Sequence, residues 1–216
     1  MKQLKASKAN ILSLKAIVSL AVAVVVVLFL VVNSLNRSSN MSMPMSSPNM
    51  MASNTKVAST PAMKQAFVTL AATHTDVCQD MGNKPAINNY MNVLPNGSSL
   101  QGSCCSPMDM KKYVSQVTAL KKYSDIHQIP PDPYDTSVAS AKQMLGYYDN
   151  IQLTTAQQSV YDSAQKMTTD KGWCCCQCWA WYTHAGLAKY LITQQGFNTQ
   201  QIVEVTNLED CCGGAS

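Results

Sequence analysis

The strongest hydropathy signal in the chain is a long apolar segment near the N-terminus. It runs from Ala16 to Val32 and extends through Leu35, with four lysines and no acidic residue before it. A helix needs roughly 20 apolar residues to cross a bilayer core, and preceding lysines mark the cytoplasmic end. The pattern predicts a cytoplasmic tail over 1–15 and a single-pass transmembrane anchor over 16–35, with the remaining chain extracytoplasmic. The alternative is a signal peptide cleaved at an unusual site.

Residues 36–58 are polar and consist mostly of Asn, Ser, Met and Pro. Such a stretch cannot bury enough apolar surface to offset its chain entropy, so we expect a disordered linker. Met41, Met43 and Met45 are spaced two apart within it. Thioethers are soft ligands that suit Cu(I), which makes these residues candidate metal ligands. The alternative is a biased linker that happens to use methionine.

Beyond residue 59, start signals and apolar spacing are mainly helical. Thr60 followed by Pro61 is typical of a helix N-terminus and predicts a helix through about Thr73. Ser106-Pro107 repeats that signature, and apolar positions after it recur at helical spacing. A second helix is therefore expected to begin there.

The C-terminal part continues the helical pattern. Thr154 and Gln157 form a capping-box pattern, and apolar spacing predicts a further helix over 136–149. A long helix is expected from near Trp173 to Gln195, followed by a short one near 199–205. Strand alternation is nowhere convincing. The predicted fold class is mainly α, with a small all-helical, cysteine-rich domain over 59–216.

The charge distribution adds to the membrane prediction. The formal net charge is +4, and four lysines precede the apolar segment. Beyond that segment, eleven lysines and Arg37 balance twelve acidic residues. The positive charge is thus a topology signal rather than a nucleic-acid footprint, and no nucleic-acid partner is expected.

Cysteines are the candidate chemistry of the domain. Nine lie beyond the apolar segment, and four of them occupy the five positions 174–178. Four thiols so close cannot all pair with neighbours, since a disulfide needs a Cα separation of roughly 4.4–6.8 Å. They therefore reach distant cysteines or hold a soft ion, of which Cu(I) is favoured. The candidate cysteine ligands are Cys104, Cys105, Cys174, Cys175, Cys176, Cys178, Cys211 and Cys212.

Two other uses of the cysteines stay open. Oxidising compartments favour disulfides, and eight of the nine cysteines could form four bridges. Cys175 and Cys178 form a Cys-x-x-Cys, but it lacks the strand-then-helix context of a thioredoxin-like site, so catalysis is not favoured. Zinc normally shows paired Cys-x-x-Cys elements or histidines at set intervals. Glu209 and Asp210, before the last cysteines, are expected to form a solvated acidic turn.

The cysteine run also resembles a known motif. Trp173-Cys174-Cys175-Cys176-Gln177-Cys178 fits Cys-x-Cys-x-Cys, which is similar to the core of the bacterial PCYCGC-motif (CYCXC) extracytoplasmic proteins. The segments 186–192 and 199–202 are similar to the helix and x-Gln-Ile segment that follow the cysteines there. The leading Pro and middle Gly of that motif are missing here. The resemblance implies a secreted or anchored cysteine-rich domain and no established activity.

Together these patterns predict a membrane-anchored, outward-facing helical protein that binds a soft metal ion for sequestration, delivery or sensing. The methionine linker would capture or hand over ions, and the cysteines would hold them tightly, because thiolates bind soft cations more strongly than thioethers. The rival functions are a thiol–disulfide oxidoreductase and a structural, disulfide-stapled interaction domain.

Overall fold

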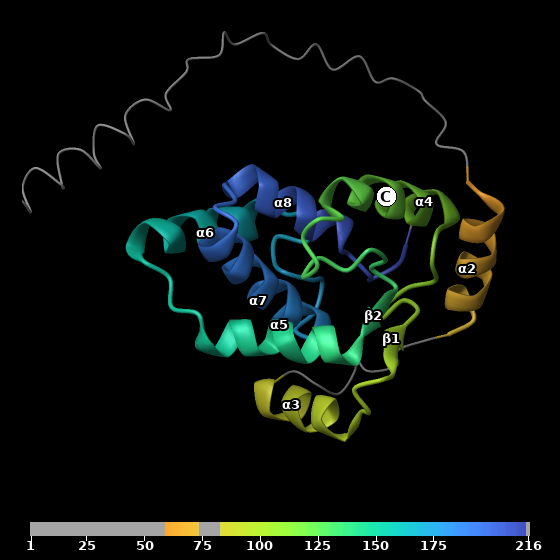
Figure 1. The fold of residues 1–216 in the computed structure, drawn as a ribbon, viewed down its shortest axis with the longest axis horizontal. Coiled ribbons are helices and arrows are strands. Elements are labelled where there is room, and N and C mark those ends of the chain that lie inside the picture. The colour runs from red at the N-terminus through yellow and green to blue at the C-terminus, as the bar shows by residue number, and fades with distance from the viewer. Residues whose placement is uncertain (1–58, 74–82, 215–216) are drawn as a thin grey trace, which may run out of the picture. The chain divides into compact units, whose positions relative to one another are not determined.

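Two stretches of the chain, residues 59–73 and 83–214, are described by the computed structural model (Figure 1). The predicted tail, anchor and linker, with Met41, Met43 and Met45, lie outside these residues and stay predictions. Within the described part of the chain, no helix combines the length and apolar character that a membrane span requires.

The described residues are mainly α-helical, as the apolar spacing predicts. Two three-residue strands, β1 (Ser99–Gln101) and β2 (Asp135–Ser137), pair in antiparallel fashion among them. The expectation of an entirely helical domain is wrong at these strands, because three residues are too few to establish a period-two pattern. The helices are α2 (Pro61–Ala71), α3 (Lys84–Val93), α4 (Met110–Leu120), the 3₁₀ turn η2 (Lys121–Tyr123), α5 (Val138–Asn150), α6 (Thr155–Met167), α7 (Trp179–Gln194) and α8 (Thr199–Leu208).

Side-chain caps explain where several helices begin. Thr60 accepts a hydrogen bond in the first turn of α2, and Thr154 with Gln157 makes both bonds of a capping box at α6. Both predicted starts are confirmed. Asn198 and Gln201 form a second capping box at the start of α8. Helix α3 is not among the predicted helices, although Asn83 caps it and a proline occupies its first turn.

The predicted helix start at Ser106-Pro107 is wrong, because this segment bonds to the C-terminal residues instead. The Ser106 N–H donates to the Cys212 carbonyl at 2.8 Å, and the Pro107 carbonyl accepts from Gly214 at 2.9 Å. Helix α4 begins at Met110, after Asp109 accepts a hydrogen bond from a first-turn N–H. The proline signature therefore marks the end of the cysteine segment and not the start of the helix.

The predicted long helix also begins later than expected, at Trp179 rather than Trp173. Residues 174–178 form an irregular loop. Lys171, just before it, has a left-handed backbone with φ of 55°, and His184 Nδ1 lies 2.8 Å from the Trp173 carbonyl oxygen. The bond ties the loop to the second turn of α7, so the cysteines precede the helix instead of lying along it.

Helix α7 is the centre of the domain and packs against α5, α6 and α8 (Figure 1). One buried apolar cluster, which includes Ile202 and Val205 of α8, lies toward α6 and α8. A second cluster contains cysteines together with residues from α2 to α5, including Leu70 and Tyr113. Five of the cysteines, Cys104, Cys174, Cys178, Cys211 and Cys212, therefore belong to the core of the domain.

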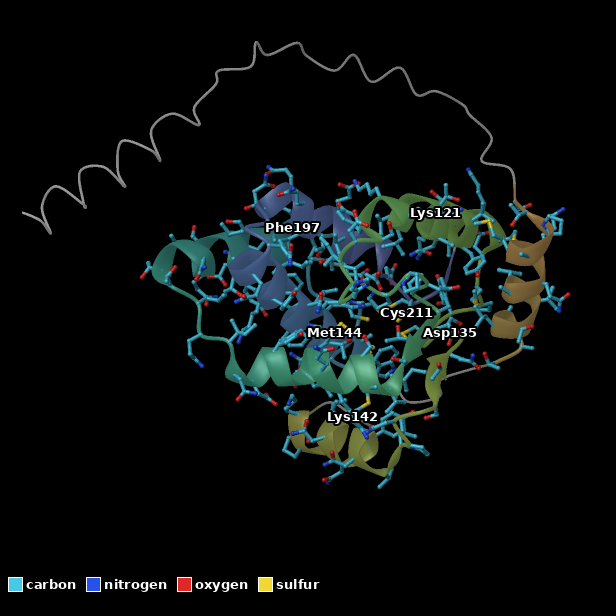
Figure 2. All side chains as sticks on the ribbon, viewed as in Figure 1. Lys121, Asp135, Lys142, Met144, Phe197 and Cys211 are labelled. Carbon is cyan, nitrogen blue, oxygen red and sulfur yellow. The ribbon has the colours of Figure 1, made fainter. Side chains whose placement is uncertain are left out.

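A glycine permits the close approach of α7 to α5. Gly186 of α7 lies directly against α5, and a Cβ at this position would overlap with the Met144 carbonyl oxygen. Met144 is labelled on α5 in Figure 2. Because a methyl group has no room there, the packing of α5 on α7 depends on this glycine.

We expect Gly186→Ala to lower the free energy of unfolding by roughly 1–3 kcal/mol, the usual range for an overpacked core. Gly146→Ala in α5 is the matched control, since a Cβ there meets nothing within 4 Å. Alanine is favoured over glycine in helices by about 1 kcal/mol, so the control should gain stability. Urea denaturation of the reduced full chain, followed by circular dichroism, measures both. Equal stability gains in the two variants would contradict the claim that α5 leaves no room for a side chain at Gly186.

Candidate metal centre

Three chain segments bring eight cysteines together. Cys104 and Cys105 follow β1, the run 174–178 precedes α7, and Cys211 and Cys212 follow α8. Cys211, labelled in Figure 2, is 1 % exposed. Cys78, the ninth cysteine, lies outside the described residues.

Backbone hydrogen bonds join the first and last of these segments. The Cys104 N–H donates to the Cys211 carbonyl at 3.1 Å, and the Ser106 N–H donates to the Cys212 carbonyl at 2.8 Å. Gly213 then turns with a left-handed φ of +77°, and a Cβ there would overlap with the Ser106 carbonyl oxygen. The two vicinal pairs are thus fixed side by side by main-chain bonds that do not depend on their sulfurs.

Buried side chains next to the 174–178 run fix its position in the domain. Trp173 is 1 % exposed, and its ring lies 4.5 Å from that of Tyr161. Thr168 donates from its hydroxyl to the Gly172 carbonyl at 2.7 Å. His184 is buried at 7 % exposure and contacts Trp173 through Nδ1. This histidine therefore helps to position the loop, and it belongs to none of the metal-capable side-chain groups found among the described residues.

Sulfur atoms from all three segments lie within van der Waals reach of one another. On the buried side, Cys104 Sγ lies 3.9 Å from Cys211 and 3.8 Å from Cys212. Cys174 lies 3.9 Å from Cys178 and 3.0 Å from Cys212. Four cysteine triplets have all their sulfurs within 4.8 Å of one another: 104/105/212, 104/174/178, 105/175/176 and 174/175/212.

Two of these separations suit a shared metal better than a covalent bond. A zinc–thiolate bond of about 2.3 Å, taken as a reference, places two sulfurs on a tetrahedral ion roughly 3.8 Å apart. The Cys104–Cys212 and Cys174–Cys178 distances agree with that value. The Cys174–Cys212 distance of 3.0 Å is shorter but still well beyond the disulfide length of about 2.0 Å. The residues present therefore fit a soft, thiolate-bound ion.

Hydrogen bonds among the thiols move their pKa values in opposite directions. Cys104 donates to Cys212, and hydrogen bonds from Cys104 and Cys174 lower the pKa of the Cys212 thiol. The hydrogen bond with Cys104 is the largest cause that raises the pKa of Cys174. A bond with Cys174 lowers the pKa of the exposed Cys175. Each thiol must lose its proton to bind a metal, and the lowered pKa values of Cys212 and Cys175 favour that loss.

An ion pair from α4 fixes the last cysteine segment. Lys112 Nζ lies 2.7 Å from Asp210 Oδ2 and donates to the Gly213 carbonyl at 2.9 Å. Asp210 Oδ1 in turn accepts from the Cys212 N–H at 2.9 Å. The expectation of a solvated acidic turn is wrong here, because Asp210 is paired and Glu209 is only 2 % exposed.

Two buried donors share the cysteine core. Tyr134 is fully buried and Trp179 is 3 % exposed. Their polar atoms, Oη and Nε1, have no hydrogen-bond partner among the described residues. Burial raises the pKa of Tyr134, with the charges of Asp210 and Cys211 adding to it, so its hydroxyl keeps the proton. Donors of this kind are suited to anionic sulfur. Residue spacing in the sequence does not indicate that Tyr134 or Trp179 lies at the cysteine centre.

The chain matches no known protein family, no curated protein and no solved structure. The resemblance to CYCXC proteins therefore rests on the cysteine run and the segments quoted with it. All eight candidate cysteines of the described residues are brought together, whereas the three candidate methionines lie outside the described part. The function is accordingly argued from the chemistry of the cysteine centre.

The ionisation of the Glu209 carboxyl group tests whether water is excluded from this region. Burial, with the charge of Asp132 adding to it, raises the pKa of its carboxyl group well above the ordinary value of 4.5. The fold therefore favours the protonated acid, and unfolding releases a proton once the pH exceeds that ordinary value. Stability from this group is present at acid pH and is lost as the pH rises.

We expect Glu209→Gln to raise the melting temperature at neutral pH and to have little effect near pH 4, because glutamine cannot ionise. Glu204→Gln on the same helix is the control, since Glu204 pairs with Lys122 at an exposed site where such pairs contribute about 0–1 kcal/mol. Thermal melts of the full chain across this pH range measure both. A variant that melts at or below the parent at neutral pH would contradict the buried, protonated state.

Proposed function

We propose that the protein is a membrane-anchored, extracytoplasmic protein that binds a soft metal ion, Cu(I), for sequestration, delivery or sensing. The observation that carries the proposal is the convergence of eight cysteines from three distant segments, with neighbouring sulfurs 3.0–3.9 Å apart. Thiolates are the protein ligands that soft ions prefer.

The donor set favours Cu(I) over zinc. Structural zinc sites are closed tetrahedra with four ligands for each ion. Here the sulfurs form overlapping triplets, and Cys104, Cys174 and Cys212 each belong to more than one of them. Overlapping three-sulfur groups suit an ion of low coordination number that shares its ligands with a second ion. Asp170 and Asp210 also approach Cys212, but carboxylates are hard ligands that suit Mg²⁺, Ca²⁺ or Mn²⁺ instead.

The surrounding residues would support a negatively charged centre. Tyr134 Oη and Trp179 Nε1 are buried donors with no partner among the described residues, and they would donate to metal-bound sulfurs. Outer-shell donors of this kind orient ligands and tune affinity. The main-chain bonds between the 104–106 and 211–212 segments would keep the sulfurs in place during metal exchange.

The N-terminal sequence supports the proposed location. Lysines before the apolar segment 16–35 favour a cytoplasmic tail and an extracytoplasmic cysteine domain. The linker with Met41, Met43 and Met45 would lie between the membrane and the domain. Its thioethers would take up or hand over ions at lower affinity than the thiolates.

Thiol–disulfide exchange is the second candidate, and one observation favours it. Cys175 is exposed, its pKa is lowered, and its sulfur lies 3.0 Å from that of the buried Cys212. An accessible thiolate beside a second thiol is the arrangement of a redox pair. The pair would then be Cys175–Cys212 rather than the Cys-x-x-Cys of Cys175 and Cys178. Insulin-reduction turnover that is lost in both Cys175→Ser and Cys212→Ser would promote this function.

We expect the reduced full chain to compete for Cu(I) against a chromogenic chelator under anaerobic conditions. Replacing Cys104, Cys174 and Cys178 with serine should weaken that competition by more than roughly 100-fold, because even outer-shell changes cost 10–100-fold in metal affinity. Cys78→Ser is the matched control and should compete as the parent does. A triple variant that stays folded and holds Cu(I) as tightly as the parent would contradict the assignment of these three cysteines as Cu(I) ligands.

We expect the methionines to act on rate and not on equilibrium affinity. Replacing Met41, Met43 and Met45 with leucine should leave Cu(I) affinity nearly unchanged and slow loading, since neutral thioethers bind more weakly than thiolates. Equilibrium competition and stopped-flow uptake, run on the same samples, separate the two effects. A large loss of equilibrium affinity would instead place the tight site in the linker.

A further inference from the structure

The vicinal pairs at 104–105 and 174–175 each place one sulfur inside the domain and the other at its surface. Cys104 is 9 % exposed and Cys174 is 7 % exposed, whereas Cys105 and Cys175 are exposed. Adjacent side chains outside a helix point to different sides of the backbone, so a vicinal pair separates into two depths. The inner tier consists of Cys104, Cys174, Cys178 and Cys211, and the outer tier consists of Cys105, Cys175 and Cys176.

Each tier contains a three-sulfur group of its own. The sulfurs of Cys104, Cys174 and Cys178 are all buried and lie within 4.8 Å of one another. The outer sulfurs satisfy the same limit, with Cys105 at 3.3 Å from Cys175 and 3.7 Å from Cys176. Either tier therefore has enough soft donors, at suitable spacing, to hold an ion.

Cys212 lies between the tiers and contacts both. Its sulfur is 3.0 Å from Cys174 in the inner tier and 3.0 Å from Cys175 in the outer tier. It also belongs to triplets with members of each tier. A thiolate sulfur has several lone pairs and can bind two ions at once. Cys212 is therefore placed to bridge an outer ion to an inner one.

We propose that the outer tier is the exchange site for Cu(I) and the inner tier is the store, with Cys212 passing the ion between them. This inference rests on the proposed function. A donor or acceptor molecule can reach the outer sulfurs, whereas the inner ones are covered by the core that contains Tyr134 and Trp179. Ions would therefore reach the store through the outer tier and leave by the same route.

The transfer is a ligand substitution without redox change. An ion held by Cys105, Cys175 and Cys176 forms a bond to Cys212 as one outer bond breaks. A bond to Cys174 then forms as the bond to Cys175 breaks, and bonds to Cys104 and Cys178 finally replace the last outer bond and the bond to Cys212. Each thiol that binds releases its proton to solvent, each outer sulfur that is vacated takes one up, and copper stays in the Cu(I) state throughout.

Release kinetics test the two tiers. The full chain carrying Cys78→Ser is saturated with Cu(I) anaerobically and mixed with excess chromogenic Cu(I) chelator in a stopped-flow instrument. We expect a fast phase from the outer tier and a slow phase from the inner tier. The slow phase should be at least roughly tenfold slower, because buried sites exchange only through the outer tier or through local opening.

Two matched triple variants assign the phases. Cys105→Ser/Cys175→Ser/Cys176→Ser should lose the fast phase and load the remaining copper more slowly than the parent. Cys104→Ser/Cys174→Ser/Cys178→Ser should lose the slow phase and keep the fast one. Single-phase release, or an outer-tier variant that loads as fast as the parent, would overturn the tiered exchange alone. A parent chain that retains no Cu(I) would overturn the proposed function as well.

A metal-free measurement keeps the tiers testable if a triple variant fails to fold. In the reduced Cys78→Ser chain, a chromogenic disulfide reagent should modify the three outer thiols quickly. The four inner thiols and Cys212 should react at least roughly tenfold more slowly, since access limits thiol reaction. Peptide mass mapping of partly modified protein identifies the fast positions. Equal rates at all eight cysteines would reject the division into tiers.

Discussion

The main-chain hydrogen bonds between residues 104–107 and 211–214 are the constraint on which the candidate metal centre depends. They join segments that are 107 residues apart in the chain. The same bonds keep Ser106 and Pro107 out of α4 and require a left-handed turn at Gly213. Because they involve backbone atoms alone, the sulfurs stay available for other partners. The Lys112–Asp210 ion pair and the Asp210–Cys212 bond reinforce the turn from α4.

The centre contains eight neighbouring thiols, five of them buried. Ionising them costs free energy when no cation is bound. Buried thiolates would repel one another and lose hydration, and hydrogen bonds with Cys104 and Cys174 lower the pKa of the Cys212 thiol. Burial, with the charge of Asp132 adding to it, also raises the pKa of the Glu209 carboxyl group. A soft monovalent ion replaces a proton with equal charge, and thiolate sulfur prefers it. The buried donors Tyr134 and Trp179 fit a centre that stays anionic.

Local signals in the sequence identify much of the fold but little of the site. The caps at Thr60 and Thr154 act within one helical turn, so their side chains specify the starts of α2 and α6. Ser106-Pro107 carries the same local signature and fails, because long-range bonds to the C-terminal residues outweigh it. The predicted start of α7 is wrong in a similar way, since Lys171 has a left-handed backbone and His184, within α7, contacts the Trp173 carbonyl and holds the preceding segment as a loop. Which cysteines meet, and at what depth, depends on loop closure over the whole domain, for which spacing gives no signal.

The central claim is that the cysteines act as metal-binding thiols and are not paired in disulfides. The test is alkylation of the full chain, isolated anaerobically and denatured with a chelator but without reductant, followed by intact-mass measurement. We expect all eight cysteines of the centre to be alkylated and added reductant to uncover no further sites among them. A chain in which the eight become reactive only after reduction would contradict it and would make disulfide stapling the better explanation.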